Sequence, residues 1–485
     1  MLLSTQHPNY RISLTHSYFE SVNMKNRHGT LLLLVQTVAM AFIYCLSGML
    51  SLSVFHENAL ITMSAFFPEG FALAGVLLFG TRILPGILLG QLALAYFSGF
   101  PLLTGIGIGI SNMLEAYIAL KLFHWLKLNT HLHTLRDVFG LMMLIVVVLQ
   151  PFSAFTGNAI LYFSGLLTLA QIPGSLFYWW IGNVLGQILL TPMLLIYYHE
   201  RSHTKSLYIL LIIIITVLMN YFFQITLEIK NLSLLLIITL PATIFLSTRD
   251  LLYGSISSVV LASISLYFAH NGIGTFSQTS SMIDNLLDLN YFMASHIILV
   301  LLVGVLFKEK EEAIRQLRKM AHYDYLTGLP NRHMLREEIH YAVSMSDQYG
   351  YRSAICYLDI DNFKPINDTF GHHTGDEVLK SITERVQKHI TARDAFLRIG
   401  GDEFLLILNK IDEKKEIGNI LENILVTVAS PILVDGRTLH VSCSIGVAFC
   451  PDHGITIKDL IGSADKAMYQ AKASGRNQVC YASAS

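Results

Sequence analysis

The chain divides into two parts by the spacing of its apolar residues. Between positions 30 and 307 charged residues are sparse, and apolar runs approach the roughly 20 residues that a helix needs to cross a bilayer. From position 308 onward polar and apolar residues are mixed as in a soluble protein. The apolar runs predict about ten membrane helices, at 30–54, 59–79, 83–99, 101–126, 138–163, 176–198, 207–227, 232–247, 251–270 and 290–307.

The soluble part alternates between strand and helix patterns. A short apolar run at 353–359 ends in an acid and predicts a buried strand, and 395–408 resembles two strands around a Gly-Gly turn. A further strand is predicted at 439–449, and helices at 376–390 and 457–473. This order predicts an α/β sandwich, in which helices pack on a sheet.

Composition supports this division and excludes some functions. Of 485 residues, 53% are hydrophobic and only 14% are charged, compared with roughly 25% charged in soluble domains. The net charge of −1 gives no support for a nucleic-acid partner. The five cysteines contain no CxxC pair, so neither a zinc site nor a disulfide framework is predicted.

Basic residues predict the orientation of the membrane part. If the N-terminus is cytoplasmic, the outer loops hold only Lys230, and the remaining loop cations lie inside, as the positive-inside rule requires. The inner loops then hold Arg82, Lys127, Arg136, Arg201, Lys205 and Arg249. We therefore expect a cytoplasmic segment at 1–29, a membrane domain at 30–307, a helical linker at 308–322 and a cytoplasmic domain at 323–485.

Several polar residues fall inside the predicted spans: Glu69, Asn112, Glu115, Asn183 and Gln187. A carboxylate within the membrane is costly and therefore indicates a functional site. The alternative is that these side chains only hydrogen-bond between helices, or that they lie near the membrane interface.

The linker carries apolar residues at Ile314, Leu317 and Ala321, a narrow helical stripe. Such a stripe is suited to pairing with a second copy of the chain. The alternative is a solvated continuation of the last membrane helix.

Acidic residues in the soluble part follow predicted strands. Asp359 and Asp361 end the buried strand, and Asp402 and Glu403 follow the Gly-Gly turn. If the hairpin lies beside the strand, these carboxylates meet at one edge of the sheet. Converging carboxylates suit Mg²⁺ with substrate phosphates, whereas each acidic turn taken alone is typical of solvated surface.

Two cations lie near the C-terminal end. Lys472 and Arg476 are four residues apart and share a helix face if the helix continues. Both would then reach the same phosphates, although such a pair is also typical of an exposed helix rim.

Five motifs occur in order: Asp324 to Arg332, Leu358 to Asp368, Gly371 to Asp376, Gly400-Gly401-Asp402-Glu403-Phe404, and Ala464 to Asn477. Together they resemble the GGDEF family of diguanylate cyclases over residues 322–482. The resemblance implies a palm-like fold of the nucleotide-cyclase type. It also implies that two GTP are condensed into cyclic di-GMP and two pyrophosphates, and that a homodimer is required because each domain binds one GTP.

The resemblance also assigns roles to individual residues. It implies that Asp359, the Ile360 carbonyl and Asp402 bind Mg²⁺ or Mn²⁺. Glu403 would bind metal or deprotonate the ribose 3′-hydroxyl, and Lys364 would stabilise charge on the phosphates.

The same resemblance places guanine against Asn367 and Asp376, with His372 close by. Phe363 is counted with the substrate-binding residues, and Lys472 and Arg476 would hold the β and γ phosphates.

One position departs from the family pattern. Many relatives carry an Arg-x-x-Asp product-inhibition site, but this stretch reads Thr391-Ala392-Arg393-Asp394. We therefore expect weak or absent inhibition by cyclic di-GMP, with Arg393 as a partial substitute for the missing arginine.

The membrane part resembles the membrane-associated sensor domain of the first MASE class over about 30–307. The motifs that carry this resemblance are Phe67 to Ala74, Leu84-Pro85-Gly86 with Gly90, Asn112 to Ala116, and Trp179 to Asn183 ahead of Thr191-Pro192. The resemblance implies a multi-pass sensor in the lipid of a bacterial cell membrane, with a ligand that the sequence does not name.

Three other functions remain open from sequence. They are a non-catalytic nucleotide-binding receptor, a transporter with a regulatory domain, and a cyclase with another base preference. No EAL-type phosphodiesterase domain is expected after Arg476, so synthesis alone is predicted.

Overall fold

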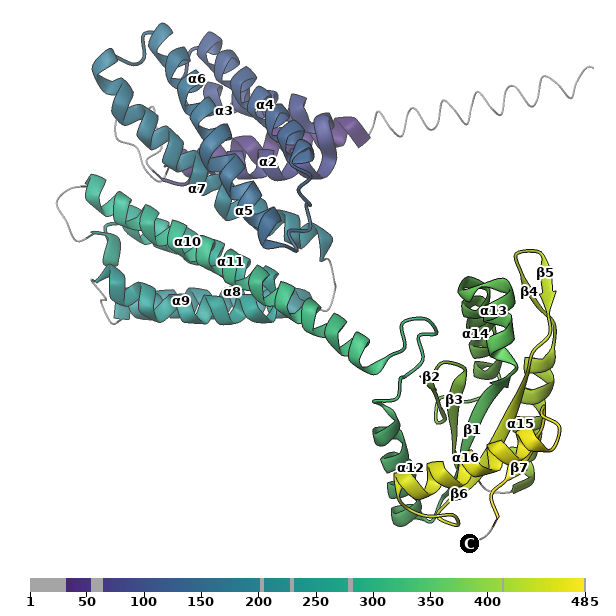
Figure 1. The fold of residues 1–485 in the computed structure, drawn as a ribbon. Coiled ribbons are helices and arrows are strands. Elements are labelled where there is room, and N and C mark those ends of the chain that lie inside the picture. The colour runs from purple at the N-terminus through teal and green to yellow at the C-terminus, as the bar shows by residue number, and fades with distance from the viewer. Residues whose placement is uncertain are drawn as a thin grey trace, which may run out of the picture. The chain divides into compact units, whose positions relative to one another are not determined.

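The computed structural model describes residues 32–53, 64–200, 205–226, 231–277, 282–411 and 414–483 (Figure 1). The predicted segment 1–29 lies outside these residues. The chain forms two compact units, Met1–Glu311 and Glu312–Ser485, and each is described by itself below.

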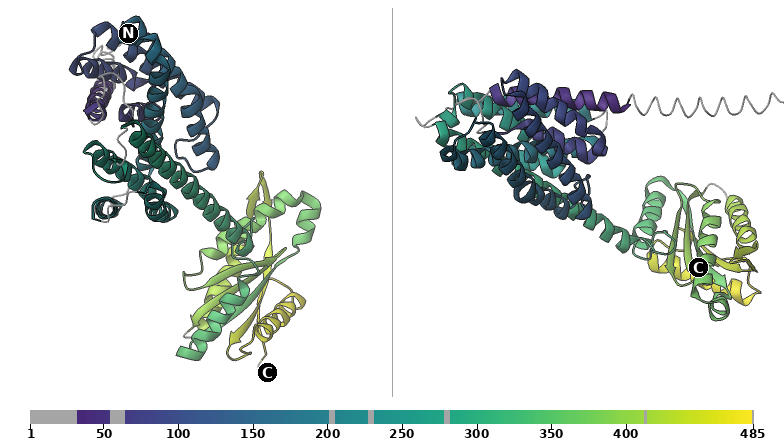
Figure 2. Two further views of the ribbon diagram at one scale, coloured as in Figure 1. Left: turned by 90° about the vertical axis from the view of Figure 1, so that its left-hand side faces the viewer. Right: turned by 90° about the horizontal axis from the view of Figure 1, so that it is seen from above.

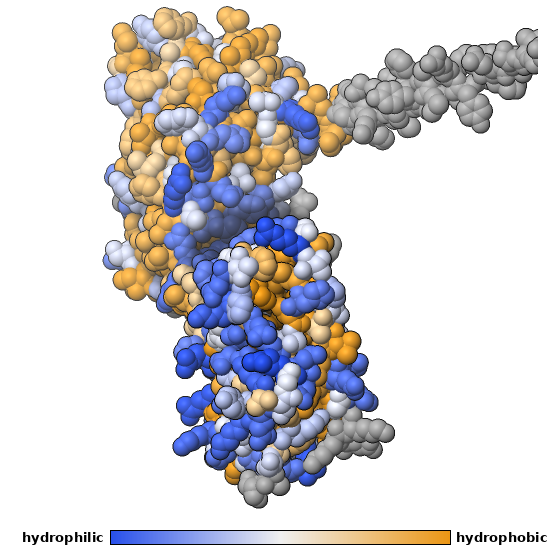
Figure 3. Space-filling model, turned by 45° about the vertical axis from the view of Figure 1, so that its right-hand side comes forward, coloured by the Kyte–Doolittle hydropathy of each residue, from blue (hydrophilic) through white to orange (hydrophobic). Residues whose placement is uncertain are grey.

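The first unit is built from apolar helices. Among its described residues and the start of the second unit, nine helical stretches are long and apolar enough to cross a membrane. They are Leu32–Ser53, Phe67–Phe97, Leu102–Trp125, Leu135–Phe163, Leu169–His199, Leu207–Ile225, Leu232–Arg249, Leu251–Ser277 and Ile283–His322. Large apolar side chains such as Phe42, Leu103 and Phe163 are exposed on this unit, whose surface is largely hydrophobic (Figure 3).

The stretch Phe67–Phe97 differs from the other eight because it folds back on itself. It contains α2 (Phe67–Phe79), a short 3₁₀ turn (Gly80–Ile83) and α3 (Leu84–Phe97). The contacts with the first helix are Phe67–Ser51, Glu69–Tyr44 and Gly75–Met40 for α2, and Gly86–Thr37, Gly90–Tyr44 and Leu94–Gly48 for α3. These contacts make α2 antiparallel and α3 parallel to the first helix.

The reversal occurs at Gly80, whose φ of 72° suits glycine. The stretch therefore supplies both of the segments predicted separately at 59–79 and 83–99, and its helices of 13 and 14 residues are shorter than predicted. The count of nine stretches and the predicted ten helices differ by this hairpin.

The remaining helices follow the predicted order, with one irregularity. The segment predicted at 138–163 comprises α5, a π-helical turn and α6. Pro151 in the first turn of α6 has no N–H to donate, which disturbs the helical hydrogen bonding just after the π turn. The bounds are α4 Leu102–Trp125, α5 Leu135–Met143, η2 Leu144–Leu149, α6 Gln150–Phe163, η3 Leu169–Gln171, α7 Ile172–His199, α8 Lys205–Tyr221, η4 Phe222–Thr226, α9 Leu232–Arg249, α10 Leu251–His270 and η5 Thr275–Ser277.

The helix α11 (Met282–His322) continues without a break from the last membrane segment through the predicted linker 308–322. Ile314 and Leu317 are exposed on it, at 39% and 61%. The prediction of a helical continuation is confirmed, whereas pairing of this stripe with a second copy stays a prediction.

The second unit is a five-stranded sheet in the order β2-β3-β1-β6-β7. The central strand β1 (Arg352–Asp361) is antiparallel to β3 and β6, and β7 is parallel to β6. The other strands are β2 Ala395–Gly400, β3 Glu403–Ile411, β4 Ile432–Val434, β5 Arg437–Leu439, β6 Ser442–Cys450 and β7 Val479–Tyr481. The predicted strands and the Gly-Gly hairpin are confirmed.

Helices cover both faces of this sheet (Figure 2). One hydrophobic core packs α14 and α15 on one face, and another packs α12 and α16 on the other. Because both faces are covered, β1 is apolar at successive positions rather than at alternate ones. The helices are α12 Leu335–Tyr349, α13 Phe363–Phe370, α14 His372–Gln387, α15 Lys414–Ala429 and α16 Ile457–Ala473.

Candidate active site of the soluble unit

The predicted acidic residues meet at one end of strands β1 and β3. Asp359 lies directly opposite Glu403 in the antiparallel pair. The Ile360 N–H donates to the Asp402 carbonyl at 3.2 Å, which holds the Gly-Gly turn against the end of β1. The strands therefore bring Asp359, Ile360, Asp402 and Glu403 together, as expected if the hairpin lies beside the buried strand.

Among the described residues, one lysine forms an ion pair with this acidic cluster. Asp359 is buried, and Lys472 Nζ from α16 lies 2.7 Å from its Oδ1. Burial raises the pKa of Asp359, the nearby Asp402 and Glu403 raise it further, and Lys472 opposes both effects. Burial and the neighbouring Glu403 also raise the pKa of Tyr357. The site is therefore short of positive charge.

The described residues contain no ready-made cluster of three or more His, Cys, Asp or Glu side chains that could hold a metal ion. The predicted metal ligands include a main-chain carbonyl, that of Ile360, and Asp359 is paired with Lys472. Oxygen donors of this kind are the type that Mg²⁺ prefers. The metal-binding roles of Asp359, Ile360, Asp402 and Glu403 stay predictions.

The start of α13 lies immediately after β1. Asn362 precedes the helix with φ 58°, and no side chain caps it, so its first N–H groups are available to an anion. Lys364 is exposed in this turn. The Phe363 side chain is buried in the core at 7% exposure, so a substrate-binding role for Phe363 is restricted to its main chain.

The two predicted guanine readers come from adjacent helices. Asn367 on α13 lies against Gly375 on α14 so closely that a Cβ there would overlap its Oδ1. That Oδ1 has no hydrogen-bond partner among the described residues. Asp376 follows Gly375 directly, and His372 is exposed at the first residue of α14.

Lys472 and Arg476 would share a helix face only if the helix continued to Arg476, and it does not. The helix α16 ends at Ala473, and Gly475 and Arg476 follow with φ of 117° and 63°. Arg476 is therefore exposed in a left-handed turn rather than on the helix face that carries Lys472. Gly475 ends the helix because glycine adopts such angles without strain.

Sequence reasoning missed the separate role of Asp361. Its carboxylate accepts from the hydroxyls of Ser442 and Ser444 at 2.7 Å each and from the Asn477 N–H at 3.2 Å. Asp361 therefore connects β1 to β6 and to the turn after α16, and its acceptors are occupied. The Asp-x-Asp spacing signals two acids but does not distinguish their partners.

A second missed residue is Arg398 on β2. Its Nη1 donates to Asp324 at 2.9 Å, and its Nε and Nη2 donate to the Gly401 carbonyl at 3.1 and 2.7 Å. Burial alone would raise the pKa of Asp324, but hydrogen bonds from Thr327 and Arg398 outweigh it and lower the pKa. Arg398 thus joins the opening segment of this unit to the Gly-Gly turn.

Comparison with known families identifies both units. Residues 31–311 match the family model MASE1, and residues 321–478 match the model described as diguanylate cyclase, GGDEF domain. The chain is a MASE1–GGDEF protein. It is a multi-pass membrane protein of cyclic di-GMP signalling, and GGDEF cyclases as a class use GTP and divalent metal ions.

The similar curated proteins match the GGDEF domain. The chain is 37% identical to the diguanylate cyclase TpbB of Pseudomonas aeruginosa over 161 residues, 33% of this chain and 37% of TpbB. It is 35% identical to MucR of the same organism, a bifunctional diguanylate cyclase/cyclic di-GMP phosphodiesterase, over 178 residues, 37% of this chain and 26% of MucR. The matched part is therefore well under half of either relative.

Two solved GGDEF structures are also similar to this chain. The GGDEF domain of TpbB is 36% identical, covers 33% of this chain and 95% of its own, and has a TM-score of 0.33. The diguanylate cyclase SiaD of P. aeruginosa, solved with its activator SiaC, is 33% identical over 36% of this chain and 66% of its own, with a TM-score of 0.33.

Thr391, which stands where many relatives carry an arginine, hydrogen-bonds to Asp394 in this GGDEF domain. Asp394 Oδ2 accepts from the Thr391 N–H at 2.9 Å and from its hydroxyl at 2.7 Å. Asp394 Oδ1 accepts from the Asn409 N–H at 3.0 Å. Thr391 therefore makes Asp394 part of a local turn.

Proposed function

We propose that the GGDEF domain of this chain is an active diguanylate cyclase, which condenses two GTP into cyclic di-GMP and two pyrophosphates under control of the MASE1 domain. The observation that carries the proposal is the pairing of Asp359 with Glu403 beside the Asp402 turn, next to the uncapped start of α13. Carboxylates, a lysine and free backbone donors then lie together, as nucleotidyl transfer requires.

Guanine selection follows from the acceptors on α13 and α14. Guanine presents two adjacent N–H donors on its Watson–Crick edge, which a carboxylate accepts together and which adenine lacks. Asp376 supplies that carboxylate, and the unpartnered Oδ1 of Asn367 supplies a further acceptor. His372 lies one helical turn before Asp376.

The triphosphate binds the main-chain N–H groups at the start of α13, together with Lys364, Lys472 and Arg476. Asp359, the Ile360 carbonyl, Asp402 and Glu403 would hold Mg²⁺ or Mn²⁺, which neutralises phosphate charge and makes the ribose 3′-hydroxyl easier to deprotonate. Lys472, now paired with Asp359, is free to turn to a phosphate once Asp359 has another cation.

Each domain holds one GTP, so two domains must face each other for each 3′-hydroxyl to attack the other α-phosphate. A homodimer is therefore part of the proposal, and the MASE1 domain would act by positioning. The contacts that hold α11 in the membrane unit include two near its linker: Lys308 pairs with Glu200 after α7 at 2.8 Å, and Glu309 accepts from the Leu135 N–H of α5 at 2.9 Å.

We further propose a bacterial inner membrane location with both termini and the GGDEF domain in the cytoplasm. Arg82, Lys127 and Arg136 lie at the α2–α3 turn and the α4–α5 connection, which helix directions place at the same end of the bundle. The positive-inside rule makes that end cytoplasmic.

The test uses the full-length chain in lipid nanodiscs with GTP and Mg²⁺, and follows cyclic di-GMP by chromatography. We expect product from the native chain and at least a 100-fold lower rate from an Asp402→Ala, Glu403→Ala double variant. Glu384→Ala, an exposed acid on α14, is the matched control and should be unaffected. GTP binding without product from a folded, dimeric native chain would instead identify a non-catalytic receptor.

A further inference from the structure

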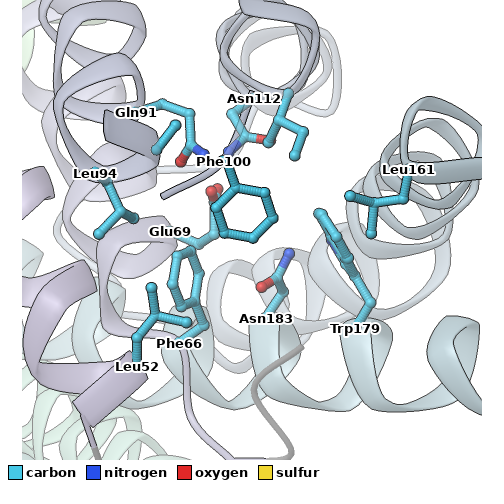
Figure 4. Close-up of a pocket in the computed structure, with 12 residues that line it drawn as sticks. Leu52, Phe66, Glu69, Gln91, Leu94, Phe100, Asn112, Leu161, Trp179 and Asn183 are labelled. Atoms are coloured by element: carbon cyan, nitrogen blue, oxygen red, sulfur yellow. The ribbon is translucent and has the colours of Figure 1, made fainter. Parts of the chain in front are cut away.

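A cavity of about 70 Å³ lies within the helices of the membrane unit (Figure 4). Carboxyl and amide groups from α2, α3, α4 and α7 approach one another across it, and aromatic rings form part of its wall. Its polar and aromatic lining residues include Glu69, Gln91, Phe100, Asn112, Trp179 and Asn183.

The Glu69 carboxylate has only neutral partners. It accepts from the Tyr44 hydroxyl at 2.7 Å, and Asn112 Nδ2 donates to the same Tyr44 oxygen at 2.8 Å. Glu69 is 2% exposed. Among the described residues, no Lys or Arg forms an ion pair with it.

Other oxygens around the cavity are also short of donors. Gln91 is 7% exposed, lines the cavity, and its Oε1 has no hydrogen-bond partner in the described part of the chain. Glu115 on α4 does not line the cavity, and its Oε1 accepts from Gln150 and Gln187 at 2.8 and 2.9 Å. Buried acceptors without donors are costly, so this region is suited to a ligand that brings positive charge and N–H groups.

We propose that this cavity binds a small primary ammonium ion, with its charged group at Glu69 and Gln91 and its carbon chain against Phe100 and Trp179. Aromatic faces attract cations, and a wall of this kind favours an organic cation over a bare metal ion. A buried water needs roughly 10–15 Å³ of such volume, so the cavity has room for a ligand of several heavy atoms. An anion is disfavoured because the described lining residues include no Lys, Arg or His.

Helix directions place the cavity in one half of the bundle. It lies where α2 and α4 begin and α6 ends, because Glu69, Ile108 and Leu161 line it. The α2–α3 turn with Arg82 and the connection after α4 with Lys127 lie at the opposite end. By the positive-inside rule, this half of the bundle is the one away from the cytoplasm.

The binding test uses the full-length protein in lipid nanodiscs and measures its thermal unfolding as ethylammonium chloride is added. We expect a saturable rise in unfolding temperature, and none with ethanol, a neutral molecule of similar size, or with sodium chloride at equal ionic strength. A rise of the same size with ethanol, or no rise with ethylammonium, overturns the proposal.

Two variants test the negative charge of Glu69 and the volume of the cavity separately. Glu69→Gln keeps an acceptor for Tyr44 but removes the charge, and should weaken ethylammonium binding at least tenfold. Ile108→Phe fills the cavity, leaves Glu69 intact, and should also abolish binding. Asp288→Asn, an exposed acid on α11, is the control and should bind as the native chain does.

Unchanged affinity in both cavity variants would assign the effect to another site and overturn the proposal. The inference gives a ligand to the proposed sensor, but its test does not use cyclase activity. A chain that makes cyclic di-GMP and does not bind ethylammonium contradicts this inference alone, and a chain that binds ethylammonium but makes no product contradicts the proposed function alone.

Discussion

Buried carboxylates in the two units are compensated in different ways. In the soluble unit Asp324 meets Arg398, Asp359 meets Lys472, and Asp361 accepts from two hydroxyls and a backbone N–H. In the membrane unit Glu69 accepts from the Tyr44 hydroxyl, and Glu115 is hydrogen-bonded to the side chains of Gln150, Gln187 and Ser153, which are all neutral groups.

The difference in compensation indicates which acids stabilise the fold and which are available to a ligand. A charge buried without a partner is unfavourable, and in a membrane it indicates a functional site. In the soluble unit Asp324 and Asp361 are held by partners within the fold, and Asp359, Asp402 and Glu403 are the acids that we propose for the substrate complex. Among the described residues of the membrane unit, Asp137 accepts from the Asn129 N–H and the Thr134 hydroxyl, whereas no Lys or Arg forms an ion pair with Glu69 or Glu115.

The largest expected effect concerns Asp359. Asp359→Asn should lower cyclic di-GMP synthesis at least 100-fold because it removes a proposed metal ligand.

The same variant tests stability. Burial raises the pKa of Asp359, so its ionised form is disfavoured in the folded state at neutral pH. The resulting loss of folding stability becomes smaller as the pH falls through the raised pKa. The variant should therefore unfold at the same or a higher temperature at pH 7. A fall of several degrees would contradict this account.

Unlike Asp359→Asn, a substitution of Asp361 should strongly lower the stability of the soluble unit. Asp361→Ala leaves Ser442, Ser444 and the Asn477 N–H without their acceptor, at an expected cost of about 3 kcal/mol in free energy of unfolding. Denaturant unfolding of the soluble unit, which has its own hydrophobic cores, measures this cost. Glu384→Ala is the control, and an equal effect for both variants would refute the role of Asp361.

Asp324 gives a pH-dependent effect of intermediate size. Its lowered pKa means that it stabilises the fold at neutral pH, and that this contribution is lost as the pH falls through the lowered value. Asp324→Asn should cost about 1–2 kcal/mol at pH 7 and progressively less on acidification. Unfolding curves at several pH values test this, and a cost independent of pH would exclude the charge as its source.

The membrane unit should tolerate the loss of a charge. Glu115→Gln keeps an oxygen for Gln150 and Gln187 and removes an uncompensated buried charge. The unfolding temperature of the full-length protein in nanodiscs should therefore stay the same or rise. Glu115→Ala, which also removes the acceptor, is the comparison and should be less stable. A large drop with Glu115→Gln would reveal a cation partner for Glu115.

The smallest expected effect is product inhibition. With Thr391 in place of arginine and Asp394 hydrogen-bonded within its turn, cyclic di-GMP at micromolar concentration should leave turnover nearly unchanged. Isothermal titration should find only weak product binding. Tight binding that is lost in Asp394→Asn would show that Arg393 replaces the missing arginine.

Much of the fold could be predicted from sequence because hydrophobic periodicity is local. The helix predicted at 457–473 has those bounds in the structure, and the strand that ends at Asp359 extends by only two residues to Asp361. The turn after α16 could not be predicted, because Gly475 and Arg476 adopt left-handed angles that residue spacing does not report. The sequence predicts the two segments on either side of Gly80. Their directions relative to the first helix follow only from the contacts between them.

The two units, their apolar and α/β character, and the acids at the end of β1 and in the Gly-Gly turn can be predicted from local sequence, since each depends on neighbouring residues. The partner of each acid depends instead on the tertiary structure. Asp359 is 113 residues from Lys472, Asp361 is 116 from Asn477, and Glu69 is 25 from Tyr44. Hydrogen bonds and ion pairs act over a few ångströms in space, so the fold has to bring these residues together before their chemistry is defined.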